Sequence, residues 1–266
     1  MPLAVCATPI GNLADVTLRV LDELSAADTV LCEDTRHTRV LLDRHGIEAR
    51  LLSYHQHNEA ARIADLVPRL QAGERLALVS DAGLPGVNDP GARLVAAALA
   101  AGIPVTVLPG ASAVETALVA SGLAEEQYRF VGYFPRSERG RAALWHELAG
   151  WPHPTVGFES PKRLGATLAS LAGVEPERRV AVCRELTKMY EEIVSDTAVA
   201  LASRYQEPPK GEVTLVLGPT TRAADAEAAV AAVVELVAAG SQRSVAAGVV
   251  AQLTGLSRNA LYERSL

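Results

Sequence analysis

The chain has 266 residues, of which 49% are hydrophobic and only 4% aromatic, so a core built mainly of Ala, Val and Leu in α/β layers is expected. This length exceeds that of a typical single domain and predicts two compact units or one large one. The formal net charge of −6 argues against a protein that coats nucleic acid through general basic charge, but it leaves room for a local basic site.

The beginning of the chain and its cysteines bear on location. The segment MPLAVCATPIGN has no basic residues ahead of its apolar run, and no apolar run approaches the roughly 20 residues of a membrane span. Cys6, Cys32 and Cys183 are far apart, and each lies in an apolar, strand-like segment. Buried, reduced thiols are therefore expected, which favours a cytoplasmic location without membrane association.

The first half of the chain alternates short apolar runs with helix-like segments, which is typical of an α/β domain with a largely parallel sheet. This domain is assigned to residues 1–121. Its strands are predicted at 3–7, 28–33, a short run ending at Ser53, 75–79 and 103–108. Its helices are predicted at 16–26 with Asp15 as N-cap, 34–46, 58–73 with Asn58 as N-cap, 91–101, and 113–121 with Ser112 as N-cap.

A polar, turn-forming stretch at residues 122–127 marks the predicted boundary of a second α/β domain, assigned to residues 122–219. Its strands are expected at 128–134, 154–160, 178–186 and 211–218. Residues 220–266 form a predicted helical tail, in which a helix at 225–240 precedes a helix-turn-helix with its turn at Thr254 and Gly255. Because the tail is only mildly basic, a helical cap is favoured over nucleic-acid contact.

Turns rich in Gly, Pro and Asp follow the predicted strands of the first domain. They are TPIGN after the first strand, EDTRHT after the second, SDAGLPG after the fourth and PGAS after the fifth. In open α/β sheets ligands bind beyond the carboxyl ends of the strands, so these turns are predicted to converge on one site. For any single turn, an idle surface loop is the alternative.

Several familiar site motifs are missing from the sequence. Neither GxxxxGK[ST] nor GxGxxG occurs at these turns, which disfavours the usual cradles for nucleotide phosphates. The chain has no HExxH and no paired CxxC, so a catalytic metal is not expected. It also lacks the GxSxG turn that marks many nucleophilic hydrolases.

The remaining motifs, taken in order, closely resemble the bacterial 16S ribosomal RNA (cytidine-2′-O)-methyltransferase family of the tetrapyrrole methylase superfamily. They include ATPIGNLADVTLRVL, EDTRHTRVLL, LVSDAGLPGVNDPG, LPGASAVETALVASGL, FESPKRL, RELTKMYEE and KGEVTLVL. The resemblance is strong over residues 3–217 and looser in the tail. It implies an α/β fold of two tetrapyrrole-methylase-type domains with a cofactor cleft between them, a small C-terminal helical segment, and a homodimer.

The resemblance also implies S-adenosyl-L-methionine as cofactor. Leu84 departs from the Thr that most members have at this position. The implied cofactor contacts are Asp81, Gly83, Leu84, Ser112, Ala113, Phe158, Glu159, Leu186, Glu212, Val213 and Thr214. Carboxylates near a sulfonium and an amino group make electrostatic sense, and apolar side chains suit an adenine ring.

The implied activity is 2′-O-methylation of a cytidine ribose in the decoding region of 16S rRNA, as naked RNA or in the small ribosomal subunit. Such an enzyme must align donor and acceptor, and it benefits from a base that removes the hydroxyl proton. The catalytic residues are predicted to be Glu33, Asp34 and His37, with Glu159, Glu185 and Lys188 as further candidates. For each, the alternative is an ion pair with a neighbouring arginine such as Arg36, Arg163 or Arg184.

RNA must reach an acidic protein, so local basic residues are expected to contact its phosphates. The predicted contacts are Arg36, Arg136, Arg139 and Arg141, the last three in a loop, RSERGR. Two other functions are weighed: methylation of a small tetrapyrrole, and non-catalytic regulation through DNA binding by the tail. The turns TPIGN and EDTRHT count against the first, and the weak charge of the tail counts against the second.

Overall fold

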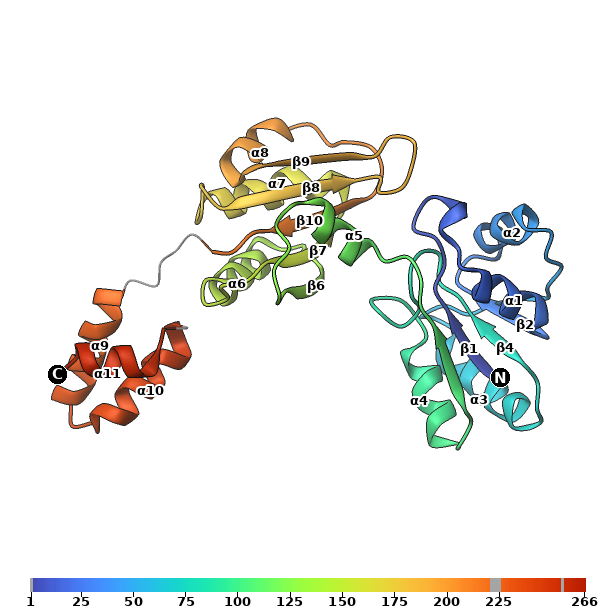
Figure 1. The fold of residues 1–266 in the computed structure, drawn as a ribbon, viewed down its shortest axis with the longest axis horizontal. Helices are drawn as coiled ribbons and strands as arrows, with labels where there is room; N and C mark the ends of the chain where they lie inside the picture. The colour runs from blue at the N-terminus through green and yellow to red at the C-terminus, as the bar shows by residue number, and fades with distance from the viewer. Residues whose placement is uncertain (1, 221–225, 255) are drawn as a thin grey trace. The chain divides into compact units, whose positions relative to one another are not determined.

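The computed structural model describes residues 2–220, 226–254 and 256–266. The chain folds into two compact units (Figure 1). Unit 1 comprises Met1–Thr116 together with Glu185–Glu191, and unit 2 comprises Ala117–Arg184 together with Glu192–Leu266. The domain boundaries predicted at residues 121 and 219 stay predictions. The inclusion of Glu185–Glu191 in unit 1 was not expected from the sequence.

Unit 1 contains a parallel sheet whose strand order, within the described residues, is β3-β2-β4-β1-β5. Every pairing in this sheet is parallel, which confirms the predicted largely parallel arrangement. Parallel strands are covered on both faces, and this explains why they read as continuous apolar runs. The strands are β1 (Leu3–Cys6), β2 (Thr29–Cys32), β3 (Leu51–Ser53), β4 (Leu76–Leu78) and β5 (Val105–Leu108).

Two apolar clusters cover the two faces of this sheet. One joins Val20 and Leu24 of α1 (Leu18–Ala26) to Leu41 and Leu42 of α2 (Thr35–Arg44). The other joins Leu66 and Leu70 of α3 (Glu59–Gln71) to Leu94 and Ala98 of α4 (Ala92–Ala100). A further helix, α5 (Ala113–Ala120), follows β5. The predicted helices are thus present, and their packing holds the strand ends in fixed positions.

The start of α1 corrects one prediction. Asp15 is not its N-cap, because Leu13–Asp15 form a short 3-10 turn and the helix begins only at Leu18. Thr17 caps α1 instead, and its hydroxyl accepts a hydrogen bond from the Val20 N–H at 3.2 Å. Thr and Asp side chains both accept a hydrogen bond from a free N–H at the start of a helix, so residue type alone does not decide between positions 15 and 17.

The capping role predicted for Asn58 at the start of α3 is also corrected. Asn58 lies at the N-cap position of α3, but its side chain makes no capping hydrogen bond. It instead accepts a hydrogen bond from the His55 N–H at 2.9 Å and donates one to the Ser53 carbonyl at 3.1 Å. Asn58 therefore closes the turn that leads out of β3.

Unit 2 contains a mixed sheet whose order, within the described residues, is β6-β7-β10-β8-β9. The β6–β7 pair is parallel and the other pairs are antiparallel. Trp145, Leu164 and Leu201 anchor three helices to one face. The strands are β6 (Arg129–Tyr133), β7 (Thr155–Glu159), β8 (Arg179–Arg184), β9 (Glu192–Thr197) and β10 (Val213–Leu217), and the helices are α6 (Glu138–Leu148), α7 (Pro161–Ala172) and α8 (Ala198–Arg204).

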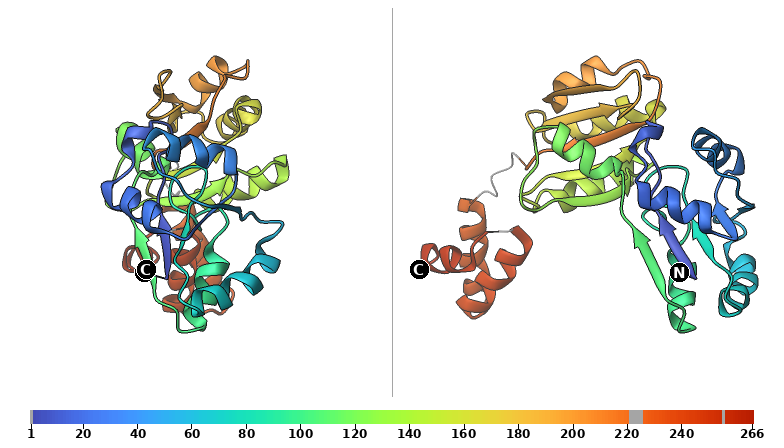
Figure 2. Two further views of the ribbon diagram at one scale, coloured as in Figure 1. Left: turned by 90° about the vertical axis from the view of Figure 1, so that its right-hand side faces the viewer. Right: turned by 45° about the vertical axis from the view of Figure 1, so that its right-hand side comes forward.

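The tail forms three helices that pack together, α9 (Ala226–Ala238), α10 (Arg243–Thr254) and α11 (Arg258–Arg264) (Figures 1 and 2). Val233, Ala247 and Leu261 lie in their shared apolar cluster. The two predicted helices are present, but Thr254 of the predicted turn is the last residue of α10, and Gly255 lies outside the described residues. Along the described chain, no helix has the length and apolarity needed to cross a bilayer.

Candidate active site

The turns that follow the strands of unit 1 meet at the carboxyl edge of its sheet. Thr8 of TPIGN and Gly83 of SDAGLPG exchange two backbone hydrogen bonds, at 2.8 and 3.0 Å. The Thr8 hydroxyl also donates to the Ser80 carbonyl at 3.0 Å. In PGAS, a Cβ added to Gly110 would lie 2.9 Å from the Ala7 Cβ, so this turn packs against the end of β1. These contacts bring three of the four turns together, as predicted, while their role as one ligand site stays a prediction.

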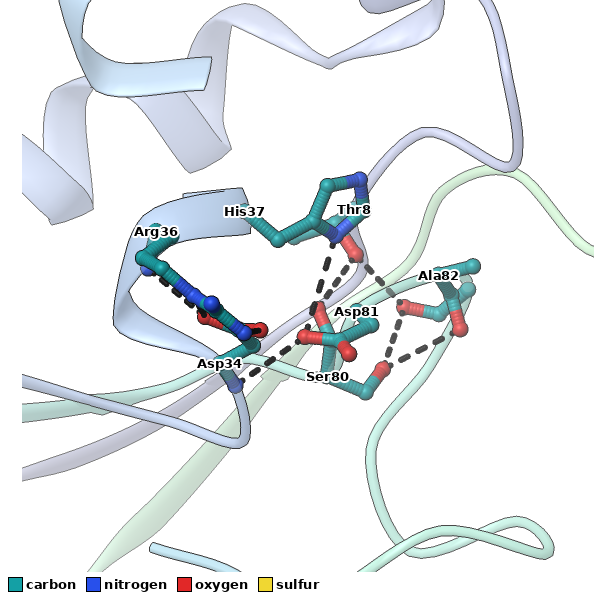
Figure 3. Close-up of polar contacts among 8 residues, drawn as sticks. Thr8, Asp34, Arg36, His37, Ser80, Asp81 and Ala82 are labelled. Carbon is teal, nitrogen blue, oxygen red and sulfur yellow. Dashed lines mark hydrogen bonds and ion pairs between the residues drawn. The ribbon is translucent and has the colours of Figure 1, made fainter. Parts of the chain in front are cut away.

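Asp81 links the SDAGLPG turn to the EDTRHT turn (Figure 3). Its Oδ1 accepts a hydrogen bond from the Asp34 N–H at 3.2 Å and lies 3.7 Å from Nδ1 of His37. The side chains of His37 and Asp81 are 59% and 43% exposed, so the pair is open to solvent. A carboxylate facing one ring nitrogen orients an imidazole and leaves the other nitrogen available for proton transfer.

Asp34 has a different role from its neighbour His37. Its carboxylate caps α2 by accepting from the Arg36 N–H at 2.8 Å, and it forms an ion pair with the Arg36 side chain at 2.7 Å. These hydrogen bonds hold the pKa of Asp34 well below its usual range. A carboxylate so strongly stabilised in its charged form is a poor proton acceptor, and the ion pair weighed as an alternative in the sequence is present.

Two more carboxylates lie near Asp81. Burial raises the pKa of Glu33, as does the negative charge of Asp81, while His55 opposes the shift. Burial, followed by repulsion from Glu33 and Asp81, raises the pKa of Asp89 to about 6. Sequence reasoning missed Asp89, although it lies in the same Gly- and Pro-rich turn as Asp81. Its burial and its acidic neighbours exist only in the folded chain.

The other cofactor positions predicted in unit 1 lie along the same edge. Gly83 has a φ of 77°, and its nearest neighbour is the Ala111 carbonyl of PGAS, 3.8 Å from an added Cβ. Leu84 packs against the apolar cluster of α3 and α4, so its side chain faces the core. Ser112 donates to the Glu115 carboxylate, and Ala113 begins α5. The SDAGLPG and PGAS turns therefore adjoin at Gly83 and Ala111, whereas the side chain of Leu84 is turned toward the core.

A second set of predicted cofactor residues lies in unit 2. Phe158 and Thr214 are paired across β7 and β10, and Glu159 is paired with Val213. Phe158 lies edge-on to the rings of Phe130 and Tyr133, at centroid distances of 5.2 and 5.6 Å. Glu212 is exposed just before β10. Leu186 belongs to unit 1, where it is buried. All of these cofactor assignments stay predictions.

Both carboxylate oxygens of Glu159 have partners within unit 2. Its side chain is 0% exposed and forms an ion pair with Arg163 at 2.6 Å. Its second oxygen accepts from the Thr167 hydroxyl at 2.5 Å, and the Ser160 N–H donates to the first at 2.6 Å. This arrangement is the ion pair that sequence reasoning weighed against catalysis, and it gives the carboxylate a structural role.

The segment RSERGR does not form the loop that was predicted. Ser137 caps α6, and the helix begins at Glu138, so Arg139 and Arg141 lie in its first turn. Arg136 and Arg139 are exposed, whereas the guanidinium of Arg141 donates to the Arg136 carbonyl at 2.9 Å. The prediction of a loop failed because Ser137 followed by Glu138 is a helix start, and charge alone does not indicate backbone conformation.

No group of three or more His, Cys, Asp or Glu side chains in the described part of the chain is arranged to hold a metal ion. The three cysteines are free and buried, as predicted.

Residues 2–202 match a protein family described as Tetrapyrrole (Corrin/Porphyrin) Methylases. The chain is also similar over nearly its full length to proteins named ribosomal RNA small subunit methyltransferase I. The protein from Mesorhizobium japonicum is 45% identical over 99% of this chain and 91% of its own length. The protein from Escherichia coli O157:H7 is 39% identical over 99% of this chain and 94% of its own.

Solved structures share the fold at low sequence identity. A uroporphyrin-III C-methyltransferase from Thermus thermophilus matches 81% of this chain and 93% of its own, with a TM-score of 0.58 and 22% identity. The methyltransferase CobJ matches 82% of this chain and 93% of its own, with a TM-score of 0.63 and 20% identity. At these identities the matches establish the fold of this chain and nothing about its substrate.

Proposed function

Because the chain belongs to the Tetrapyrrole (Corrin/Porphyrin) Methylases family and to its ribosomal RNA small subunit methyltransferase I group, we propose that it methylates the 2′-hydroxyl of a cytidine in 16S rRNA. The observation that carries the proposal is 45% identity over 99% of the chain to a protein of that name. The fold alone is shared with methyltransferases of other substrates, so it does not distinguish RNA from a tetrapyrrole.

S-adenosyl-L-methionine is proposed as the methyl donor, and the residues of unit 1 fit it. The half-exposed carboxylate of Asp81 suits a ligand that carries a sulfonium and an amino group. The positive φ of Gly83 suits a tight turn two residues from Asp81, and a Cβ added to this buried glycine would meet nothing closer than 3.8 Å. When bound, the cofactor supplies a methyl group already activated by positive charge.

His37 is proposed as the base that takes the proton from the ribose hydroxyl. Asp81 holds Nδ1 of its ring at 3.7 Å, which leaves Nε2 directed away from the carboxylate. Removal of the proton would make the 2′-oxygen a better nucleophile toward the methyl group that the cofactor would supply, and a positioned base contributes about 10²–10⁴-fold in rate. Glu33 stays a second candidate, because its raised pKa also suits proton transfer.

Exposed arginines in each of the two units are proposed to contact the phosphates of the RNA. Arg36 has an 89% exposed side chain and immediately precedes His37 on α2. Arg136 and Arg139 are exposed at the start of α6, while Arg141 supports that start. A homodimer and a cytoplasmic location are also proposed. The first rests on the family resemblance, and the second on the buried, free cysteines and the RNA substrate.

The decisive experiment incubates the protein and labelled S-adenosyl-L-methionine with small ribosomal subunits that lack the modification. The label is then mapped to a nucleotide and an atom, with naked 16S rRNA and a uroporphyrin-type tetrapyrrole as parallel acceptors. Label on the ribose 2′-oxygen of a cytidine is expected. Label in the tetrapyrrole and none in RNA would contradict the proposal.

A further inference from the structure

The segment Glu185–Glu191 belongs to unit 1, although the residues before and after it in the sequence belong to unit 2. It lies directly on the TPIGN turn. The Asn12 N–H donates to the Thr187 hydroxyl at 3.0 Å. A Cβ added to Gly11 would lie 2.5 Å from Cγ of Lys188 and 2.8 Å from the carbonyl oxygen of Leu186. Only glycine fits beneath this segment, so its position on the turn is closely defined.

The backbone of the segment is held in an uncommon conformation. Glu185 and Thr187 have φ values of 52° and 64°, a region that β-branched residues such as Thr rarely adopt. The Thr187 N–H donates to the Glu191 carboxylate at 2.6 Å, and Nζ of Lys188 donates to the Glu185 carboxylate at 2.9 Å. Strain of this kind persists only where the surroundings fix the backbone, and it gathers at functional sites.

This segment presents two adjacent apolar side chains to solvent, next to the exposed Glu191. Met189 and Tyr190 are 89% and 71% exposed and are adjacent in sequence. Among the described residues, Tyr190 is the most exposed aromatic side chain. A strained backbone that holds an aromatic ring in water is a cost to the free protein, which a bound partner would offset.

Met189 and Tyr190 form the tip of this segment, and the TPIGN turn on which the segment lies also belongs to the candidate active site. Thr8, three residues before Gly11, bonds to Ser80 and Gly83, which flank Asp81. The tip is thus anchored to the same loops that hold His37. Unit 1 also carries the exposed arginines Arg36, Arg39 and Arg44 on α2, which suit the phosphates of a nucleic-acid strand.

We propose that the tip formed by Met189 and Tyr190 recognises the substrate RNA, with the Tyr190 ring stacked on an unpaired nucleobase near the methylated nucleotide. Proteins read single-stranded RNA largely by stacking splayed bases on aromatic side chains. This inference rests on the proposed function and adds a substrate-recognition residue to it. The tip has no part in the chemical step, so its contribution lies in substrate binding.

The test compares methyl transfer to unmodified small subunits by the full-length wild type, Tyr190→Ala, Tyr190→Leu and Tyr190→Phe. Tyr190→Ala is expected to lower kcat/KM by roughly 5- to 100-fold through a higher KM for RNA, as loss of one stacked base predicts. Tyr190→Phe keeps the ring and is expected to retain most of the activity. Tyr190→Leu is apolar without a ring and is expected to resemble Tyr190→Ala.

Tyr262→Ala removes another exposed tyrosine, on α11, and is expected to match the wild type. Calorimetry with S-adenosyl-L-methionine and a melting curve should show unchanged cofactor affinity and folding in every variant. Equal RNA kinetics for wild type and Tyr190→Ala would overturn this inference while leaving the proposed function intact. A change of oligomeric state in Tyr190→Ala would also overturn it, because the tip would then contact a second copy of the chain. A wild type that methylates no RNA would overturn the proposed function as well.

Discussion

Asp81 follows β4 and Glu159 is the last residue of β7, so each lies at the carboxyl end of a strand, yet the two units use them differently. Asp81 is 43% exposed and contacts the second loop through one hydrogen bond and a loosely placed imidazole. Glu159 is 0% exposed, and both of its oxygens are taken by Arg163, Thr167 and Ser160. Charge near a ligand site is available for chemistry only where the protein has not already neutralised it.

The largest effect is expected from removing the base that Asp81 orients. His37→Ala should lower kcat for methyl transfer by about 10²–10⁴-fold, because the ribose hydroxyl then loses its proton to water. Single-turnover kinetics at saturating RNA and cofactor isolate this step. Val40→Ala, at an exposed position of the same helix, is the matched control. A His37→Ala rate equal to that of the control would rule out His37 and leave Glu33 as the candidate.

In unit 2, Glu159→Ala should mainly lower the free energy of unfolding. It leaves the half-buried guanidinium of Arg163 and the buried hydroxyl of Thr167 without their acceptor, at a cost of about 3 kcal/mol. Chemical denaturation measures the loss, and Glu207→Ala, which removes an exposed carboxylate of the same unit, serves as the control. Unchanged stability together with lost cofactor binding would mean that Glu159 acts on the ligand after all.

Asp81→Ala is expected to weaken S-adenosyl-L-methionine binding by roughly 10- to 100-fold, which is what a hydrogen bond to a charged group contributes. Calorimetry measures the affinity, and a melting curve checks that the loops remain folded. Asp81→Asn keeps an oxygen for the Asp34 N–H while removing the charge, so it separates loop support from ligand attraction. If both variants bind the cofactor normally, the SDAGLPG turn acts through its backbone.

The smallest expected effect concerns Asp89, whose pKa is raised to about 6. A raised pKa means that the folded state binds the proton more tightly, so this stabilisation is complete below about pH 4 and is lost as the pH rises through about 6. Asp89→Asn does not titrate, and its Tm should exceed that of the wild type by roughly 2–4 °C at pH 8. The difference should vanish near pH 4, and exposed Asp22→Asn should show none. An advantage that did not change with pH would contradict this account.

The sequence predicted the elements that have strong local signals. Continuous apolar runs located the buried parallel strands, and glycines marked several helix ends. It missed the edge strand β9, because Ile193 and Val194 are the only large apolar residues among charged and polar neighbours. It also assigned the cap of α1 to Asp15 and made a loop of the first turn of α6. In each case several local conformations satisfy the same hydrogen-bonding groups, and packing selects one.

The sequence by itself predicted that the turns after the parallel strands lie together, because parallel strands connected by helices end at the same edge of a sheet. It also placed Asp81 and His37 in those turns. Only the tertiary structure decided which charged groups are free: it paired Asp34 with Arg36, locked Glu159 against Arg163 and placed Thr187 on the TPIGN turn. Asn12 and Thr187 are 175 residues apart, and such distant contacts leave no local pattern in the chain.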